Sequence, residues 1–168
     1  SIATLFGFWI ASVSLITYCS SSNCGAFWGS FLYMFGMTIS FYTLKFILGF
    51  FLERFSGDFP TALFFAYSAM ALICGIGSYI LYFWNKKALF SSLLCALPAS
   101  GMLAEAIACL IVLWKRKMLL GQTIFDLVFA VIFGVLLYWK AKSKLLFFLT
   151  LVIATGIMFF LIYWPYLL

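Results

Sequence analysis

Three ionisable side chains lie inside long apolar stretches of this sequence: Lys45, Glu105 and Asp126. A charged group at the centre of a membrane helix costs about 3 kcal/mol, so such groups are rare and usually have a function or a charged partner. Two carboxyl groups in a medium of low dielectric constant cannot both stay ionised unless a cation lies near them. The chemistry that these residues offer is therefore the binding and release of a cation. The cation is a proton, a metal ion or the cationic group of a substrate.

The spacing along the chain places the three residues at similar depths. At about 1.5 Å of rise per helical residue, Glu105 lies about 15 Å before the basic segment Lys115–Lys117, and Asp126 lies about 12 Å after Met118. By the same measure Lys45 lies about 12 Å from the end of its own apolar stretch, on the same side of the membrane. The sequence therefore predicts one layer that holds all three, with Lys45 as the counter-charge.

Other residues near the two carboxyl groups fit a polar site. Gln122 lies one helical turn before Asp126 and is expected on the same helix face. Pro98 and Gly101 precede Glu105, and a proline inside a helix frees a backbone carbonyl, which lines a cavity rather than lipid. The predicted ligand-binding residues, with no metal or cofactor assigned to them, are Lys45, Glu105, Gln122 and Asp126.

A structural role for the same charges is the alternative that the sequence leaves open. Lys45 is near enough to the end of its stretch to extend its ammonium group into the headgroup layer. An ion pair between Glu105 and Lys45 would equally hold helices together without binding any ligand.

The composition indicates what kind of protein positions these residues. Of the 168 residues, 67% are hydrophobic and 8% are charged, against about 45–50% and about 25% in soluble domains. So few charges cannot cover a surface that faces water, whereas bilayer hydrocarbon is a good solvent for Leu, Phe and Ile. The sequence therefore predicts an all-α, polytopic transmembrane helix bundle.

The apolar stretches have the lengths that this class requires. A helix of about 20 residues crosses about 30 Å of hydrocarbon. Trp84, Trp114 and Trp139 end three of the stretches beside cationic residues, as is typical of the membrane interface. We predict a single transmembrane domain, residues 1–168, with short loops and six spans: 2–18, 25–52, 60–84, 88–114, 119–139 and 145–166.

The sequence contains few features that would indicate an enzyme. The chain has no histidine, which removes the usual general base and the commonest zinc ligand. It has no Gly-x-Ser-x-Gly, His-Glu-x-x-His or phosphate-loop motif. The loops leave no room for a nucleotide-binding fold, so any use of ATP would need a separate ATPase chain. We predict a protein that is not an enzyme and has no cofactor. Its predicted partners are the lipid bilayer and, in second place, another membrane subunit or that ATPase chain.

The net charge of +6 lies almost wholly in the loops, where it suits anionic headgroups rather than nucleic acid. The basic residues are divided almost evenly between the two sides, so they do not fix the orientation. Cys19 and Cys24 flank the first loop. A disulfide between them would place that loop in an oxidising compartment. Two free thiols are the alternative.

Two segments carry a family resemblance: Ser1-Ile2-Ala3-Thr4-Leu5-Phe6-Gly7-Phe8-Trp9 and Leu97-Pro98-Ala99-Ser100-Gly101-Met102-Leu103-Ala104-Glu105-Ala106. In these and in its layout the chain resembles an uncharacterised family of small bacterial multi-pass membrane proteins. The resemblance implies a further helix before Ser1 and no particular activity. A bacterial plasma membrane is the predicted location. In size and number of spans the chain is also similar to the substrate-binding subunits of energy-coupling-factor vitamin transporters. That family's small-residue pattern on the first helix is not clear here.

Two functions follow as predictions. The first is the binding or transport of a small solute or cation through an intramembrane polar site. The second is a non-catalytic accessory or assembly role in a membrane complex. A transporter should have a polar cavity at the layer of Glu105 and Asp126. An accessory subunit should have both side chains paired and an apolar face left for a partner.

Overall fold

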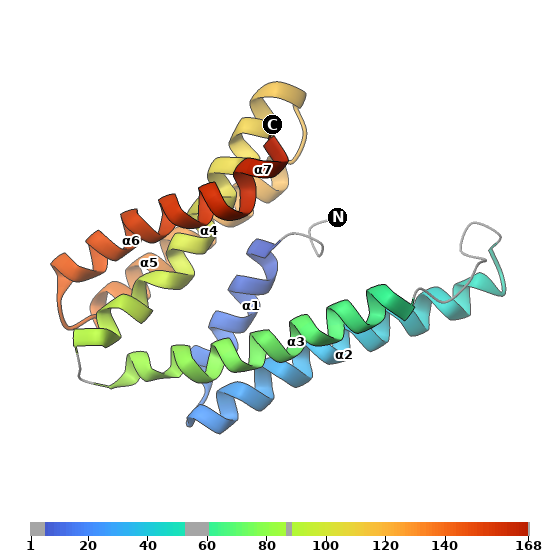
Figure 1. Cartoon of the computed structure of the whole chain (residues 1–168), viewed down its shortest axis with the longest axis horizontal. Helices are drawn as coiled ribbons and strands as arrows, with labels where there is room; N and C mark the ends of the chain where they lie inside the picture. Colours follow the sequence, from blue (N-terminus) through green and yellow to red (C-terminus); the bar gives the residue numbers. More distant parts are fainter. Residues whose placement is uncertain (1–5, 53–60, 87–88, 168) are drawn as a thin grey trace. The chain divides into compact units, whose positions relative to one another are not determined.

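The structure is a computed structural model that describes residues 6–52, 61–86 and 89–167. Every element of secondary structure in these ranges is a helix (Figure 1), which confirms the all-α class. The α-helices are α1 (Phe6–Cys19), α2 (Asn23–Gly49), α3 (Thr61–Leu81), α4 (Leu89–Arg116), α5 (Leu120–Lys140), α6 (Lys144–Met158) and α7 (Trp164–Leu167). A 3-10 turn, η3 (Tyr82–Asn85), follows α3, and a π-helical segment, η4 (Phe159–Tyr163), joins α6 to α7.

Five helical segments are long and apolar enough to cross a membrane. They are Asn23–Gly49, Thr61–Asn85, Leu89–Arg116, Leu120–Lys140 and Lys144–Tyr163. Each coincides with one of the last five predicted stretches, because continuous apolar runs of this length bury their backbone polar groups only as helices. The fold agrees with the predicted helix bundle and is compatible with a multi-pass membrane protein.

Helix α1 includes every described residue of the predicted first span. It has 14 residues and is therefore about 21 Å long, against about 30 Å of hydrocarbon. The beginning of that predicted span, residues 2–5, lies outside the described residues. So do the predicted second loop from Glu53 onward, residue 60 at the start of the third span and residue 88 at the start of the fourth.

The chain forms two compact units. One, Ile16–Tyr82, consists mainly of α2 and α3, which lie side by side and antiparallel (Figure 1). The buried Ser78 hydroxyl of α3 donates a hydrogen bond of 2.6 Å to the buried Ser30 hydroxyl of α2. The Asn23 amide donates to the carbonyl oxygen of Tyr79 over 2.9 Å. These contacts fix the register of the helix pair.

The other unit combines the first part of α1 with Phe83–Leu168. Helix α4 is its centre, because α5, α6 and the C-terminal helical turns all pack against it. Most buried side chains of α4 are Ala, Ser, Gly or Cys, and small residues let membrane helices approach closely. The N-terminal part of α1 also packs here, with Ile10 against Gly101 of α4 and the Phe8 ring 6.2 Å from the Phe125 ring of α5.

Polar contacts fix the connection between α5 and α6. Ser143 caps α6 by accepting a hydrogen bond from the backbone N–H of Leu146. Its own N–H donates to the Ser92 hydroxyl of α4 over 2.9 Å. The ammonium group of Lys144 donates to carbonyl oxygens at the end of α5, including that of Ala141 at 3.0 Å, where a cation also suits the helix dipole.

The connection between α4 and α5 is a tight reversal over residues 117–119. Lys117 (φ 52°) and Leu119 (φ 70°) both adopt the left-handed backbone region, which costs about 1–2 kcal/mol for a residue with a Cβ atom. This reversal makes α4 and α5 antiparallel neighbours that pack against each other.

Cysteine accessibility tests this arrangement. Cys19 and Cys24 are free and exposed, whereas Cys95 is free and buried on α4. The disulfide considered for the first two stays a prediction. We expect a membrane-impermeant maleimide to label a variant that keeps only Cys19 or only Cys24, and not one that keeps only Cys95. Labelling before and after permeabilisation reports the side on which the first loop lies. Labelling of Cys95 as fast as that of Cys19 would contradict a central α4.

Candidate functional site

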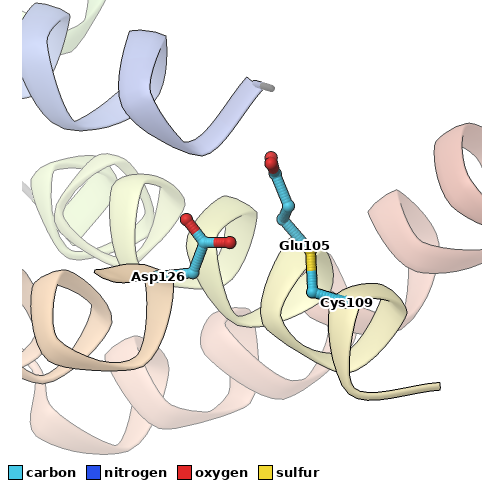
Figure 2. A group of neighbouring side chains, drawn as sticks. All are labelled: Glu105, Cys109 and Asp126. Atoms are coloured by element: carbon cyan, nitrogen blue, oxygen red, sulfur yellow. The ribbon is translucent and has the colours of Figure 1, made fainter. Parts of the chain in front are cut away.

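Glu105 of α4 and Asp126 of α5 lie close together inside the unit that is centred on α4. Glu105 lies 11 residues before the end of α4 and Asp126 lies six residues after the start of α5, so they are about 16 Å and about 9 Å from the reversal that joins the helices. Both are buried, with 1% and 0% of their surface exposed. Figure 2 shows both carboxyl groups on the side of their helices that faces α1.

Gln122 links the two carboxyl groups. Its Nε2 donates a hydrogen bond of 2.8 Å to Oδ1 of Asp126 and a longer one of 3.4 Å to Oε1 of Glu105. Gln122 is 2% exposed and lies one turn before Asp126 on α5, where residues four apart share a face. The structure thus brings three of the four predicted site residues together.

Lys45 lies elsewhere, on α2 in the Ile16–Tyr82 unit, where it is half-buried. Its part as the counter-charge of the site stays a prediction.

Tyr163 is a site residue that sequence reasoning did not identify. Its hydroxyl donates a hydrogen bond of 2.7 Å to Oε2 of Glu105. Tyr163 ends the π-helical segment η4, and single-turn π segments inside helices are frequent at functional sites. The sequence offers no signal for it, because an aromatic residue near the end of a span is typical of the membrane interface.

Gly7, in the first turn of α1, is also part of the site. A Cβ atom there would lie 2.1 Å from Oδ1 of Asp126, so only glycine fits without displacement. The backbone of Gly7 forms a hydrogen bond with the Glu105 carboxyl group.

The hydrogen bonding of the site is incomplete among the described residues. Within the described part of the chain, no hydrogen-bond partner reaches Oδ2 of Asp126 or Oε1 of Gln122, although both are buried. Buried polar atoms in folded proteins nearly always have a partner, because an unsatisfied one costs about 1–3 kcal/mol. The two oxygens are therefore available to a proton donor or a cation.

Cys109 completes the cluster. It lies one turn after Glu105 on α4 and is 4% exposed. Its sulfur, one oxygen of Glu105 and one oxygen of Asp126 all lie within 4.8 Å of one another, and Figure 2 shows the three side chains together. Its spacing of four residues from Glu105 is visible in the sequence.

Comparisons with protein-family models, with curated proteins and with solved structures each gave no match. The family resemblance and the bacterial plasma membrane therefore stay predictions, and the function is argued from the geometry of the site.

Substitution of Gly7 tests the close approach of α1. We expect Gly7→Ala to destabilise the protein by about 1–3 kcal/mol, because the new methyl group must displace Asp126 or α1. Gly134→Ala on α5 is the matched control, since its Cβ atom would meet nothing within 4 Å. Thermal unfolding in detergent measures both. Equal stability of the two variants would contradict the packing of α1 on this site.

The hydrogen bond from Tyr163 to Glu105 is tested by a double-mutant cycle. We expect Tyr163→Phe and Glu105→Ala to couple by about 0.6 kcal/mol and by no more than about 1.7 kcal/mol, the mean and the maximum for hydrogen bonds between membrane helices. Additive losses of unfolding free energy would show that the two side chains do not interact.

Proposed function

We propose that this chain is a multi-pass membrane protein that binds a cation at the pair formed by Glu105 and Asp126. We further propose that this binding serves the passage of a small solute or cation across the membrane. The observation that carries the proposal is the burial of two carboxyl groups that converge on one point, while Oδ2 of Asp126 and Oε1 of Gln122 have no donor among the residues that the structure describes.

The groups that donate to the pair support a cation. The three donors named above are the Gln122 amide, the Tyr163 hydroxyl and the Gly7 backbone N–H. All three are uncharged. Hydrogen bonds from neutral donors orient carboxyl groups but do not neutralise them, and two close negative charges in a medium of low dielectric constant repel strongly. A cation that binds between them removes that repulsion.

The two carboxyl groups differ in their hydrogen bonding, and this difference suits the uptake and release of a ligand. Each oxygen of Glu105 has a donor, since Gln122 serves Oε1 and Tyr163 serves Oε2. Within the described ranges, Asp126 uses only one oxygen in hydrogen bonding to a side chain. Glu105 is thus held in place, while Asp126 keeps an oxygen with which to take up and release a ligand.

An accessory or assembly role is the second candidate. The hydrogen bonds to both oxygens of Glu105 favour the accessory role, because a group that only holds helices together should have all its hydrogen bonds. The unsatisfied oxygen of Asp126 favours the cation site. The same experiment separates the two.

Thermal stability of the purified protein tests the proposal. The protein in detergent is unfolded across a range of pH values and in separate titrations with Na⁺, K⁺, Mg²⁺, Ca²⁺, Mn²⁺ and Zn²⁺. A cation that binds only the folded state stabilises it by about 2.7 kcal/mol at a hundredfold excess over Kd. We expect one such cation, or the proton, to stabilise the protein, and the response to disappear in Glu105→Gln and Asp126→Asn.

Glu53→Gln is the matched control, because it removes a carboxyl group from a predicted loop. It should keep the full response. The stabilising cation is then tested for uptake into proteoliposomes. A flat response to every cation and to pH, with Glu105→Gln merely less stable, would overturn the proposal and favour the accessory role.

A further inference from the structure

The sulfur atom beside the carboxyl pair narrows the choice of cation. Na⁺, Mg²⁺ and Ca²⁺ bind oxygen ligands, whereas a thiolate favours zinc and other transition metals. We infer that the site binds a divalent first-row transition metal of the Zn²⁺ type through Glu105, Cys109 and Asp126. This inference rests on the proposed cation binding and specifies the ligand of that same site.

The geometry of the three side chains fits such an ion after a small adjustment. Ligand atoms at about 2.0–2.3 Å from a tetrahedral metal are about 3.5 Å apart. The three atoms here lie within 4.8 Å of one another, so shifts of about 1 Å bring them into range. Glu105 and Cys109 are one turn apart on α4, and Asp126 faces them from α5.

Gln122 supplies a fourth ligand. Its Nε2 already contacts both carboxyl groups, and its Oε1 has no partner among the described residues. A half-turn of the amide about its last side-chain bond exchanges the two atoms and presents the carbonyl oxygen to the same point. The resulting set of one sulfur and three oxygens has the four ligands of a tetrahedral site.

The charges of the metal-bound site nearly balance. The Cys109 thiol releases its proton to water on binding, so two carboxylates and one thiolate face a dication and leave one negative charge. The Tyr163 hydroxyl and the Gly7 backbone N–H both donate to Glu105. Such donors behind a ligand orient it and tune the affinity for the metal.

Cys95 provides the matched control. It is a buried cysteine of the same helix, and it lies about 15 Å along α4 from Glu105. If Cys109 served packing alone, Cys109→Ser should affect metal binding no more than Cys95→Ser does.

Titration with Co²⁺ tests the inference, because a thiolate bound to Co²⁺ gives a near-ultraviolet charge-transfer band that oxygen ligands do not. We expect the purified protein and Cys95→Ser to show the band and to lose it when Zn²⁺ is added. Cys109→Ser should lack the band and bind Co²⁺ at least roughly tenfold more weakly. A variant that keeps Cys109 as its only cysteine should retain the band, which guards against a folding defect in Cys109→Ser.

Each other outcome overturns the inference in a recognisable way. Binding of Co²⁺ without the band, and with equal affinity in Cys109→Ser, would leave a cation site made of oxygen ligands alone. Absence of Co²⁺ and Zn²⁺ binding would refute the metal but leave the proposed function intact if protons, Na⁺ or another tested cation stabilise the protein. No response to any cation or to pH would overturn both.

Discussion

The burial of two carboxyl groups side by side is the constraint on which the organisation of the unit around α4 depends. Each costs free energy to remove from water, and each makes the burial of the other more costly. The unit offsets this cost with several donors from separate elements. Gln122 comes from α5, Tyr163 from η4 and Gly7 from α1. Three elements therefore converge on one pair of side chains.

Convergence at this point requires helices that approach closely. Small residues on the buried face of α4 bring the neighbouring backbones near. The approach is closest at Gly7, because its backbone is too near Asp126 to leave room for a Cβ atom. The short connections set the register, because the left-handed residues Lys117 and Leu119 reverse the chain within three positions. Packing and polar pairing thus depend on each other.

The sequence predicted the helices well because the bilayer leaves a continuous apolar run few alternatives to a helix. From the helical rise it also predicted one layer with Lys45, Glu105 and Asp126, and the structure brings the two carboxyl groups of that layer close together. Gln122 followed from its spacing on α5. Tyr163 and Gly7 did not follow, because their places depend on a π-helical turn and on where α1 packs. Neither residue belongs to a local sequence pattern that would indicate its place in the site.

The difference between the two carboxyl groups is the strongest argument against a purely structural pair. A structural network gains stability from each hydrogen bond it completes, and an unsatisfied member makes it worse than an apolar contact. Glu105 meets that standard, whereas Asp126 and Gln122 each retain a buried oxygen without a donor among the described residues. Both oxygens belong to α5, opposite the Cys109 sulfur of α4. A ligand that bridges these two helices would satisfy Oδ2 of Asp126 and, once the amide of Gln122 has turned, its Oε1 as well. A carboxyl group anchored on only one side can release that ligand again.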